Sequence, residues 1–342
     1  MLLPILLGLG LWGGLSAPAP AAAEATPVAG GELRVYVANA GDDSVTVVDA
    51  TRYAVVATVA VGQEPHQLLA VQGGQKVYVG NFGADTVSVI DAVALREVAT
   101  IKVGAKPTRL AATPDGRFVL VNSFGEGTTS VIEVATDQVV ATIGEGKGRH
   151  GIVAAPDGTL AFAVNNTVNS VSVIEVGSWQ VLGTIPVGAS PFGAAISPDG
   201  QTLYVAAAGI NSVSVIDVAS RSVVAGVAVG QQPLILAASP DGRSVFAGNS
   251  GEGTVSVIDT ATHAVRDTIE VGGSPIGVGL SPDGSTLYVA DSAGGELVVL
   301  DPVGKEVLAR VPVGANPVGL GIGGGAAPPV ATPIAPSPAP TN

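Results

Sequence analysis

The sequence contains no cysteine, which excludes disulfides, thiolate metal sites, iron–sulfur clusters and covalent haem attachment. Positive charge is also scarce, with 15 Lys and Arg residues against 28 Asp and Glu residues and a net charge of −13. Because a nucleic-acid surface needs clustered Lys and Arg against the phosphates, and no basic block is present, this composition argues against nucleic acid as a partner. The chain must therefore depend on its packing for stability.

Long hydrophobic runs are missing as well. The apolar segment Leu2–Leu11 is too short to span a bilayer, so we expect no stable transmembrane span. The small residues Ala21–Ala23 follow it as a cleavage site would. Residues 1–23 are therefore predicted to be a secretory signal peptide, although they contain no Lys or Arg, and a retained anchor is the alternative. We expect an exported protein, in the periplasm, on the cell surface or outside the cell.

What the sequence has in abundance is one repeat of 42 residues. An acidic residue closes a Val/Ile-rich run in each copy, at Asp49, Asp91, Glu133, Glu175, Asp217, Asp259 and Asp301. A glycine recurs with the same spacing, at Gly62, Gly104, Gly146, Gly188, Gly230, Gly272 and Gly314. A fixed period of this length indicates supersecondary units that are stacked or arranged in a ring.

Each unit contains four short apolar runs separated by turn residues. In the unit that begins at Val187 these are FGAAIS, LYVAA, SVSVID and SVVAGVAVG, the last of which leads into the next unit, and they are bounded by Gly, Pro, Asn, Asp or Ser. No segment within the repeats keeps a helical 3.6-residue period. The pattern predicts an all-β, seven-bladed β-propeller with four antiparallel strands per blade. A two-sheet sandwich is the alternative, but it would not require a strict period.

The ends of the repeat array define the domain boundaries. We predict a linker at 24–32, one propeller domain at 33–322 and a disordered Pro/Ala-rich tail at 323–342. The first unit lacks its first strand, whereas the last consists only of that strand, Val318–Ile322. The C-terminal strand should therefore join the N-terminal blade and close the ring, leaving a monomer without open blade edges at the seam.

The motifs YVAN (Tyr36–Asn39) and YVGN (Tyr78–Asn81), the PDG turns and the SVID runs resemble the YVTN-type β-propeller repeat family. The resemblance covers nearly the whole repeat region. It implies a kinship with surface-layer and periplasmic propellers and, more distantly, with lactonase-like, lyase and haem-binding propellers. These functions differ widely, so the resemblance predicts the fold much more narrowly than the activity.

The repeats serve as their own control, because a residue present in every blade is explained by the blade. The seven acidic residues are predicted to cap turns by accepting bonds from backbone N–H groups, as are the Asp residues of the PDG turns. Calcium binding is the rival interpretation, but one carboxylate per blade does not match a D-x-D-x-D-G loop. We expect no metal site.

One position varies between blades in chemical character. It follows the loop proline and contains His66, Thr108, His150, Phe192, Leu234, Ile276 and Val318. The segment around His150 departs furthest from the repeat, because Arg149 replaces the proline and Glu145 replaces a valine. The candidate ligand-binding residues of this arc are His66, Phe82, Arg109, Phe124, Lys147, Arg149 and His150. The alternative is an ordinary solvated loop rim.

Two functions compete on this basis. The first is a binding or surface-associated module for a protein partner or a small anionic ligand, since every loop has the same length and none forms a lid. The second is a lactonase-like hydrolase or lyase, with His66 or His150 as general base and Arg109 with Arg149 stabilising an oxyanion. We expect no cofactor; a non-covalent redox cofactor would need two axial ligands. Protonation of the histidines below about pH 6.5 is expected to strengthen anion binding.

Overall fold

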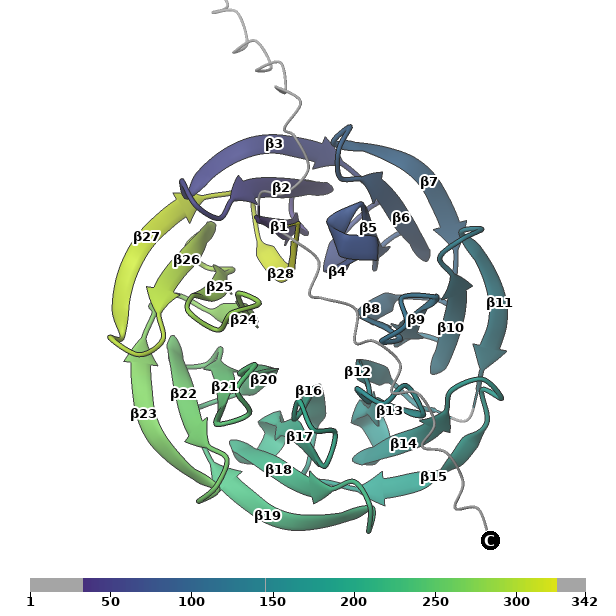
Figure 1. Ribbon diagram of the computed structural model, residues 1–342, viewed down its shortest axis with the longest axis vertical. Helices are drawn as coiled ribbons and strands as arrows, with labels where there is room; N and C mark the ends of the chain where they lie inside the picture. Colours follow the sequence, from purple (N-terminus) through teal and green to yellow (C-terminus); the bar gives the residue numbers. More distant parts are fainter. Residues whose placement is uncertain (1–32, 145, 325–342) are drawn as a thin grey trace, which may run out of the picture.

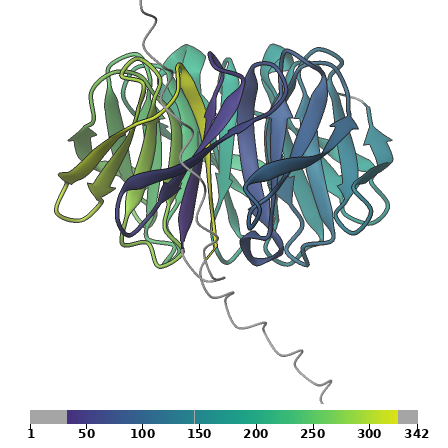
Figure 2. The ribbon, with the colours of Figure 1, turned by 90° about the horizontal axis from the view of Figure 1, so that it is seen from above.

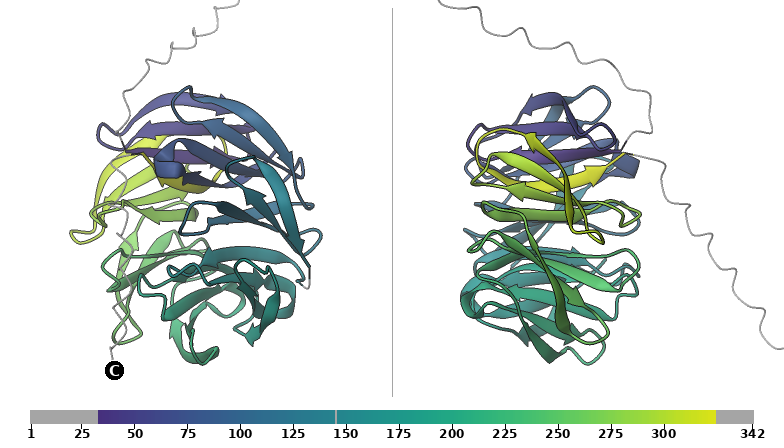
Figure 3. Two further views of the ribbon diagram at one scale, coloured as in Figure 1. Left: turned by 45° about the vertical axis from the view of Figure 1, so that its right-hand side comes forward. Right: turned by 90° about the vertical axis from the view of Figure 1, so that its left-hand side faces the viewer.

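The computed structural model describes residues 33–144 and 146–324, and these form a ring of seven four-stranded antiparallel sheets (Figure 1). The signal-peptide and linker predictions lie outside the described residues, as does nearly all of the predicted tail. Seven separate sheets around one axis confirm the propeller and exclude the two-sheet sandwich. Seen from the edge, the blades stand side by side in a disc (Figures 2 and 3).

We number the blades in chain order, each from its innermost strand outward. Blade 1 contains β28 (Pro317–Gly323), β1 (Arg34–Asn39), β2 (Ser44–Asp49) and β3 (Ala54–Ala60). Blade 2 contains β4 (Pro65–Val71), β5 (Lys76–Asn81), β6 (Thr86–Asp91) and β7 (Arg96–Lys102). Blade 3 contains β8 (Pro107–Ala112), β9 (Phe118–Ser123), β10 (Thr128–Glu133) and β11 (Gln138–Ile143). Blade 4 contains β12 (Arg149–Ala154), β13 (Leu160–Asn165), β14 (Ser170–Glu175) and β15 (Val181–Pro186).

The remaining blades repeat this order. Blade 5 contains β16 (Pro191–Ile196), β17 (Thr202–Ala207), β18 (Ser212–Asp217) and β19 (Ser222–Ala228). Blade 6 contains β20 (Pro233–Ala238), β21 (Ser244–Asn249), β22 (Thr254–Asp259) and β23 (Ala264–Glu270). Blade 7 contains β24 (Pro275–Leu280), β25 (Leu287–Asp291), β26 (Glu296–Asp301) and β27 (Glu306–Pro312). Residues 33–144 and 146–324 contain three short 3-10 helices, at Gln72–Gly74, Asn166–Val168 and Ala208–Ile210. Among the described residues, no helix has the length and hydrophobicity that crossing a bilayer requires.

The C-terminal strand closes the ring, as the split repeat predicts. β28 pairs antiparallel with β1 from Arg34↔Gly323 to Asn39↔Pro317 (Figure 1). It also packs between the inner strands β4 and β24 of the adjacent blades. Residues from opposite ends of the propeller therefore complete one sheet.

The core lies between neighbouring blades. The described residues form seven apolar clusters, each built from the facing sides of two adjacent sheets; the cluster between blades 2 and 3, for example, joins Val87 and Val89 to Val119 and Val121. Because both faces of the middle strands are covered, nearly continuous Val, Ile and Ala runs are required there. This burial explains why the runs do not alternate between apolar and polar residues.

The inner strands approach one another so closely that some positions require glycine. A Cβ built on Gly319 of β28 would lie 2.1 Å from the carbonyl oxygen of His66 on β4, and one on Gly193 of β16 would lie 2.4 Å from that of Leu234 on β20. Such contacts are shorter than any real Cβ contact. These glycines therefore permit the close packing around the axis.

The recurring acidic residues cap turns. Asp49 Oδ1 accepts hydrogen bonds of 2.8 Å from the backbone N–H groups of Thr51 and Arg52, and the Asp residues of blades 2, 5, 6 and 7 accept equivalent bonds. In the PDG turns, Asp115 Oδ1 accepts a bond of 3.0 Å from Arg117 N. These contacts confirm the turn interpretation at those positions. Glu133 and Glu175 accept instead from the hydroxyls of Thr136 and Ser178.

Candidate functional site

The candidate site lies where the inner strands of blades 2 to 5 begin, at the end of the axis that we call the axial mouth. The same face contains the loops between the second and third strands, because Phe82 N donates to Glu64 O (2.9 Å) and Phe124 N donates to Lys106 O (2.9 Å). These bonds tie each loop to the segment that enters its blade. Phe82 and Phe124 are thereby fixed beside the first residues of the inner strands.

His66 and Phe82 form an aromatic stack in blade 2. Their ring centroids are 4.3 Å apart and their planes differ by 7°. The ammonium group of Lys106 lies 5.5 Å from the centroid of Phe82, within the range of a cation–π interaction. All three side chains are thus held in one group.

His150 lies between phenylalanines of the two neighbouring blades. Its ring centroid is 3.5 Å from that of Phe192 on β16 and 6.0 Å from that of Phe124, which it meets edge to face. The residue is only 9% exposed, and its Nδ1 has no hydrogen-bond partner among the described residues. A buried imidazole nitrogen without a partner is unusual in a folded protein and is suited to a group supplied by a ligand.

Arg109 is the half-buried cation of the mouth. Its Nη1 donates to Gln67 Oε1 on β4, and Gln67 Nε2 donates to the carbonyl oxygen of Leu320 on β28 (2.9 Å). A hydrogen-bonded bridge therefore runs across blades 3, 2 and 1. It holds the guanidinium in place while using only one of its five N–H donors for Gln67.

Burial and Arg109 together keep both histidines neutral. Burial, and secondarily the charge of Arg109, lowers the pKa of His66 to about 4. Burial, then Arg109 and then His66, lowers the pKa of His150 well below its ordinary value. Burial also lowers the pKa of Arg109 to about 10, so this side chain remains charged at neutral pH. The expectation that the histidines gain charge below pH 6.5 is therefore wrong, because both lie in a poorly solvated site next to a cation.

Arg149 does not act at the mouth as the sequence suggested. It is fully buried, and its Nε, Nη1 and Nη2 donate to Gly127 O (3.0 Å), Thr129 Oγ1 (2.9 Å) and Gly144 O (2.6 Å). These acceptors belong to blade 3 and the segment that leaves it. The guanidinium is thus engaged by the protein, which corrects its assignment as a ligand donor, oxyanion stabiliser or catalytic candidate.

The structure places the other predicted residues as follows. His66, Phe82, Arg109, Phe124 and His150 all lie at the axial mouth. His66 contacts Phe82 and His150 contacts Phe124, while Arg109 bonds to Gln67 and its charge acts on both histidines. Lys147 is exposed in the loop before β12. Glu145 lies outside the described residues. Within the described part of the chain, no three His, Asp or Glu side chains are grouped as a metal site would require.

Three residues of the site were not selected from the sequence. Phe192 is an apolar residue at the variable position, and it packs against His150. Asn122 and Thr129 are fully buried polar residues in contact with this region. A position-by-position comparison of the repeats would have revealed Asn122 and Thr129, because the equivalents of both in the other six units are all apolar or glycine.

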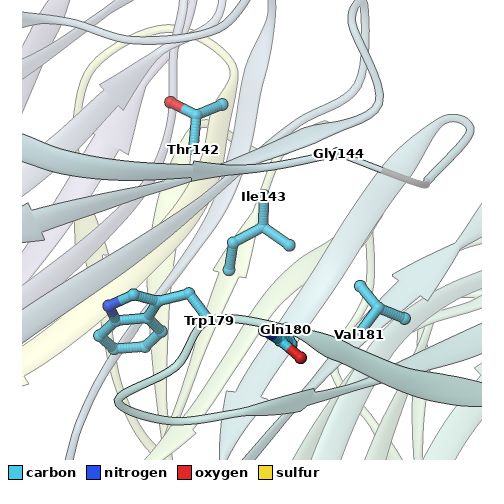
Figure 4. A pocket seen from close by; sticks show the side chains of 6 residues that line it. All are labelled: Thr142, Ile143, Gly144, Trp179, Gln180 and Val181. Atoms are coloured by element: carbon cyan, nitrogen blue, oxygen red, sulfur yellow. The ribbon is translucent and has the colours of Figure 1, made fainter.

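A hollow of about 320 Å³ lies on the outer rim between β11 and β15 (Figure 4). It is lined by Thr142, Ile143, Gly144, Trp179, Gln180 and Val181. None of these side chains is charged, and the indole of Trp179 packs edge to face on Phe118 with centroids 5.2 Å apart. The rim hollow therefore lacks the convergent polar groups that the axial mouth contains.

Comparison with known proteins supports a β-propeller family. The family model described as YNCE-like beta-propeller matches residues 95–238, and the Cytochrome D1 heme domain model matches residues 31–150. This chain is a seven-bladed β-propeller. Neither match covers half of the chain, and the narrower YVTN-type assignment stays a prediction. A search of curated proteins gave no match.

Solved structures share the fold over most of the chain. Kuenenia stuttgartiensis hydrazine synthase is 25% identical, with a TM-score of 0.67, over 75% of this chain and 88% of that one. A functionally unknown protein from Desulfotomaculum acetoxidans DSM 771 is 17% identical, with a TM-score of 0.73, over 85% and 98%. Dihydro-heme d1 dehydrogenase NirN in complex with DHE is 17% identical, with a TM-score of 0.64, over 84% and 74%. The two likenesses at 17% identity concern the fold alone.

Proposed function

We propose that the chain is an exported ligand-binding β-propeller that holds a small, flat, carboxylate-bearing ligand at the axial mouth. One observation carries this proposal: the half-buried cation Arg109 lies in a group of neutral aromatic side chains from blades 2 to 5. In a chain with a net charge of −13, a cation held in this way favours an anion as the ligand. Export rests on the sequence of residues 1–23.

Each part of the ligand would meet a different group. A guanidinium presents parallel N–H donors that match a carboxylate, and such charge-assisted bonds are among the stronger ones in proteins. The rings of Phe124, Phe192 and His150 offer surfaces for an aromatic body. The unpartnered Nδ1 of His150 can exchange one hydrogen bond with a polar substituent. An aromatic carboxylate therefore uses more of the site than acetate or phosphate does.

Calorimetric titration of the purified protein with 2-naphthoate, benzoate, acetate and phosphate tests this proposal. We expect the affinity to decrease in that order, because the ring contacts are lost first and the carboxylate geometry last. Affinity that depends on charge alone, with phosphate equal to naphthoate, would count against the aromatic part of the site. No binding of any of the four would return the arc to an ordinary loop rim.

A tetrapyrrole is the second candidate ligand, favoured by the Cytochrome D1 heme domain match, which spans His66, Arg109 and His150. The donor chemistry fits, since neutral imidazoles can ligate iron and Arg109 can pair with a carboxylate substituent. His66 or His150 would hold the iron, and the bound group would supply redox chemistry. Adding haemin and recording the absorbance spectrum, with His66→Ala and His150→Ala as comparisons, tests this candidate. A spectrum that is identical with and without protein would exclude haemin as a ligand.

The lactonase or lyase hypothesis loses one of its two proposed oxyanion stabilisers, because Arg149 is buried and bonded to the protein. A neutral His66 can still accept a proton, but only Arg109 remains to stabilise an oxyanion. Purified protein can be screened for lactone hydrolysis, with His66→Ala as the variant. Turnover that is lost in His66→Ala would favour an enzyme over a simple binding module.

A further inference from the structure

Three buried polar residues at the junction of blades 3 and 4 replace apolar residues of the repeat. Thr129 stands where the other units carry Val45, Val87, Val171, Val213, Val255 and Leu297. Asn122 stands where they carry Ala38, Gly80, Val164, Ala206, Gly248 and Ala290. Arg149 stands where they carry proline. All three side chains have no exposed surface.

These three residues are joined by hydrogen bonds across the junction. Arg149 Nη1 donates to Thr129 Oγ1 (2.9 Å), and the hydroxyl of Thr129 donates to Asn122 Oδ1 (2.6 Å). Each of the three side chains thus has a hydrogen-bond partner within the group. Three substitutions that would separately leave buried polar groups unpaired instead form one network, which we call the junction network.

The junction network ends on the backbone of His150 and Gly151. Asn122 Nδ2 donates to Gly151 O (2.8 Å) and lies 3.3 Å from His150 O. The hydroxyl of buried Thr108 lies 3.2 Å from His150 O and 3.1 Å from Arg149 O. Side chains of blade 3 therefore hydrogen-bond to the first residues of the inner strand of blade 4.

The sheet of blade 4 does not fix this segment by itself. Its register passes from Arg149↔Asn165 directly to Ile152↔Ala163, so His150 and Gly151 fall in the irregular stretch between the two pairs. Phe192 and Gly193 occupy the equivalent irregular stretch in blade 5. There the residues of the preceding blade that are equivalent to Asn122 and Thr129 are both valine. The network supplies to His150 a restraint that the strand ladder lacks.

We propose that Arg149, Thr129 and Asn122 are positioning residues that fix the backbone at His150 and so hold its imidazole between Phe124 and Phe192. Burying polar groups where six other units bury apolar ones gains little stability, since a well-packed apolar set is as good or better. A geometric role accounts for their presence at this one junction, next to the mouth. The effect on ligand binding rests on the function proposed above, whereas the effect on His150 does not.

The test restores the repeat at this junction with the triple variant Asn122→Ala, Thr129→Val, Arg149→Pro. Because other units carry each of these residues, the fold has precedents for them. The titration of the His150 imidazole is followed by NMR through its carbon-bound protons, and His150→Gln identifies the signal among the three histidines of the chain. We expect the His150 titration midpoint to rise towards the ordinary value as the ring leaves its buried position beside Arg109 and His66.

Two single substitutions keep the test decisive if the triple variant does not fold. Thr129→Val removes only the central hydroxyl and should produce the same direction of change, whereas Thr129→Ser should restore the wild-type titration. Asn249→Ala is the matched control, because Asn249 is a fully buried amide of blade 6 that bonds to Thr254 and Ser256, remote in sequence from the junction. It should lower the melting temperature without moving the His150 titration.

Ligand affinity gives the second measurement. If naphthoate binds the wild type, the triple variant and Thr129→Val should bind it about tenfold more weakly or worse, as is typical when residues that orient a binding group are removed. If His150 titrates differently in the variants but nothing binds the wild type, the positioning role stands and the proposed function fails. An unchanged His150 titration in folded Thr129→Val would overturn the positioning role.

Discussion

The imidazole of His66 lies parallel to the ring of Phe82, with a centroid separation of 4.3 Å and an angle of 7° between the planes. This pair belongs to a larger group of aromatic side chains. The chain has only six phenylalanines, and three of them, Phe82, Phe124 and Phe192, contact a histidine at the axial mouth. Aromatic side chains are thus gathered where the repeat departs from its own pattern.

Acid should destabilise the fold through these histidines. The pKa of His66 is lowered to about 4 and that of His150 lies well below its ordinary value, so the unfolded chain binds more protons than the folded chain between about pH 6.5 and pH 4. The free energy of unfolding should therefore fall as the pH decreases through this window. Urea denaturation at pH 7.5 and pH 5 measures this, and the double variant His66→Phe, His150→Phe should lose part of the dependence. A wild type that is more stable at pH 5 than at pH 7.5, when the variant is not, would contradict the lowered pKa values of the two histidines.

The same charges predict how ligand affinity depends on pH. Between pH 8 and pH 5.5 Arg109 stays charged and both histidines stay neutral, so the affinity for naphthoate should change by less than about threefold. Calorimetry at the two pH values checks this. A rise of tenfold or more at pH 5.5 would mean that a histidine gains a proton in the complex.

Alkali should destabilise the fold through the tyrosines. Burial is the main cause that raises the pKa of four of them, and in Tyr78 the bond to Asp137 adds to it; the four are Tyr36, Tyr78, Tyr204 and Tyr288. A raised pKa in the folded state means that the unfolded chain releases protons first. The free energy of unfolding should thus fall above about pH 10. Denaturation at pH 8.5 and pH 11 measures the decrease in the free energy of unfolding between the two pH values. This decrease should be smaller in Tyr78→Phe than in the wild type.

Closure by β28 should be essential to the stability of the ring. A chain that ends at residue 316 lacks the strand that pairs with β1 and packs between β4 and β24, and it exposes apolar surface of both neighbours. We expect a loss of more than about 3 kcal/mol or failure to fold. A chain that ends at residue 324 keeps β28 and is the control, with a melting temperature close to that of the full chain. Equal melting temperatures for the two truncations would contradict the role of closure.

Glycine should be required at positions where the inner strands meet. Gly193→Ala places a methyl group 2.4 Å from the carbonyl oxygen of Leu234 and should cost about 1–3 kcal/mol, the usual range for overpacking. Gly226→Ala on the outer strand β19 is the control, because its new Cβ would lie 3.7 Å from Ser212 Oγ, an ordinary contact. Thermal denaturation of both variants checks the difference. Equal melting temperatures would show that the inner strands can separate without cost.

The fold could be predicted from the sequence because the same 42-residue pattern occurs seven times. The 42-residue period, the four apolar runs and the split first unit together determine the number of blades, the strand order and the closure by β28. The turn role of the acidic residues followed from the same repetition, and Asp49 and its counterparts confirm it. Repetition thus separated the scaffold from the rest without any knowledge of the function.

The candidate site could be predicted only in part. Departures from the repeat show which residue is unusual, but they do not show where its side chain points. His66 and His150 are departures from the repeat and do lie at the mouth with their neighbour Arg109, whereas Arg149, also a departure, points into the junction with blade 3. Which side of a strand end a long side chain takes depends on acceptors such as Thr129, which are distant in sequence. The pKa values of the histidines depend on burial, which the spacing of residues does not show.

The titration of Arg109→Gln with 2-naphthoate tests the central claim, that a ligand binds at the axial mouth. The substitution removes the half-buried charge and keeps a polar side chain next to Gln67. Because a charge-assisted hydrogen bond contributes about 1.5–3 kcal/mol, the affinity should fall at least about tenfold. Lys147→Gln removes an exposed charge from the same face and should bind within about threefold of the wild type. Equal affinities of the wild type and Arg109→Gln would contradict the account and place the ligand elsewhere.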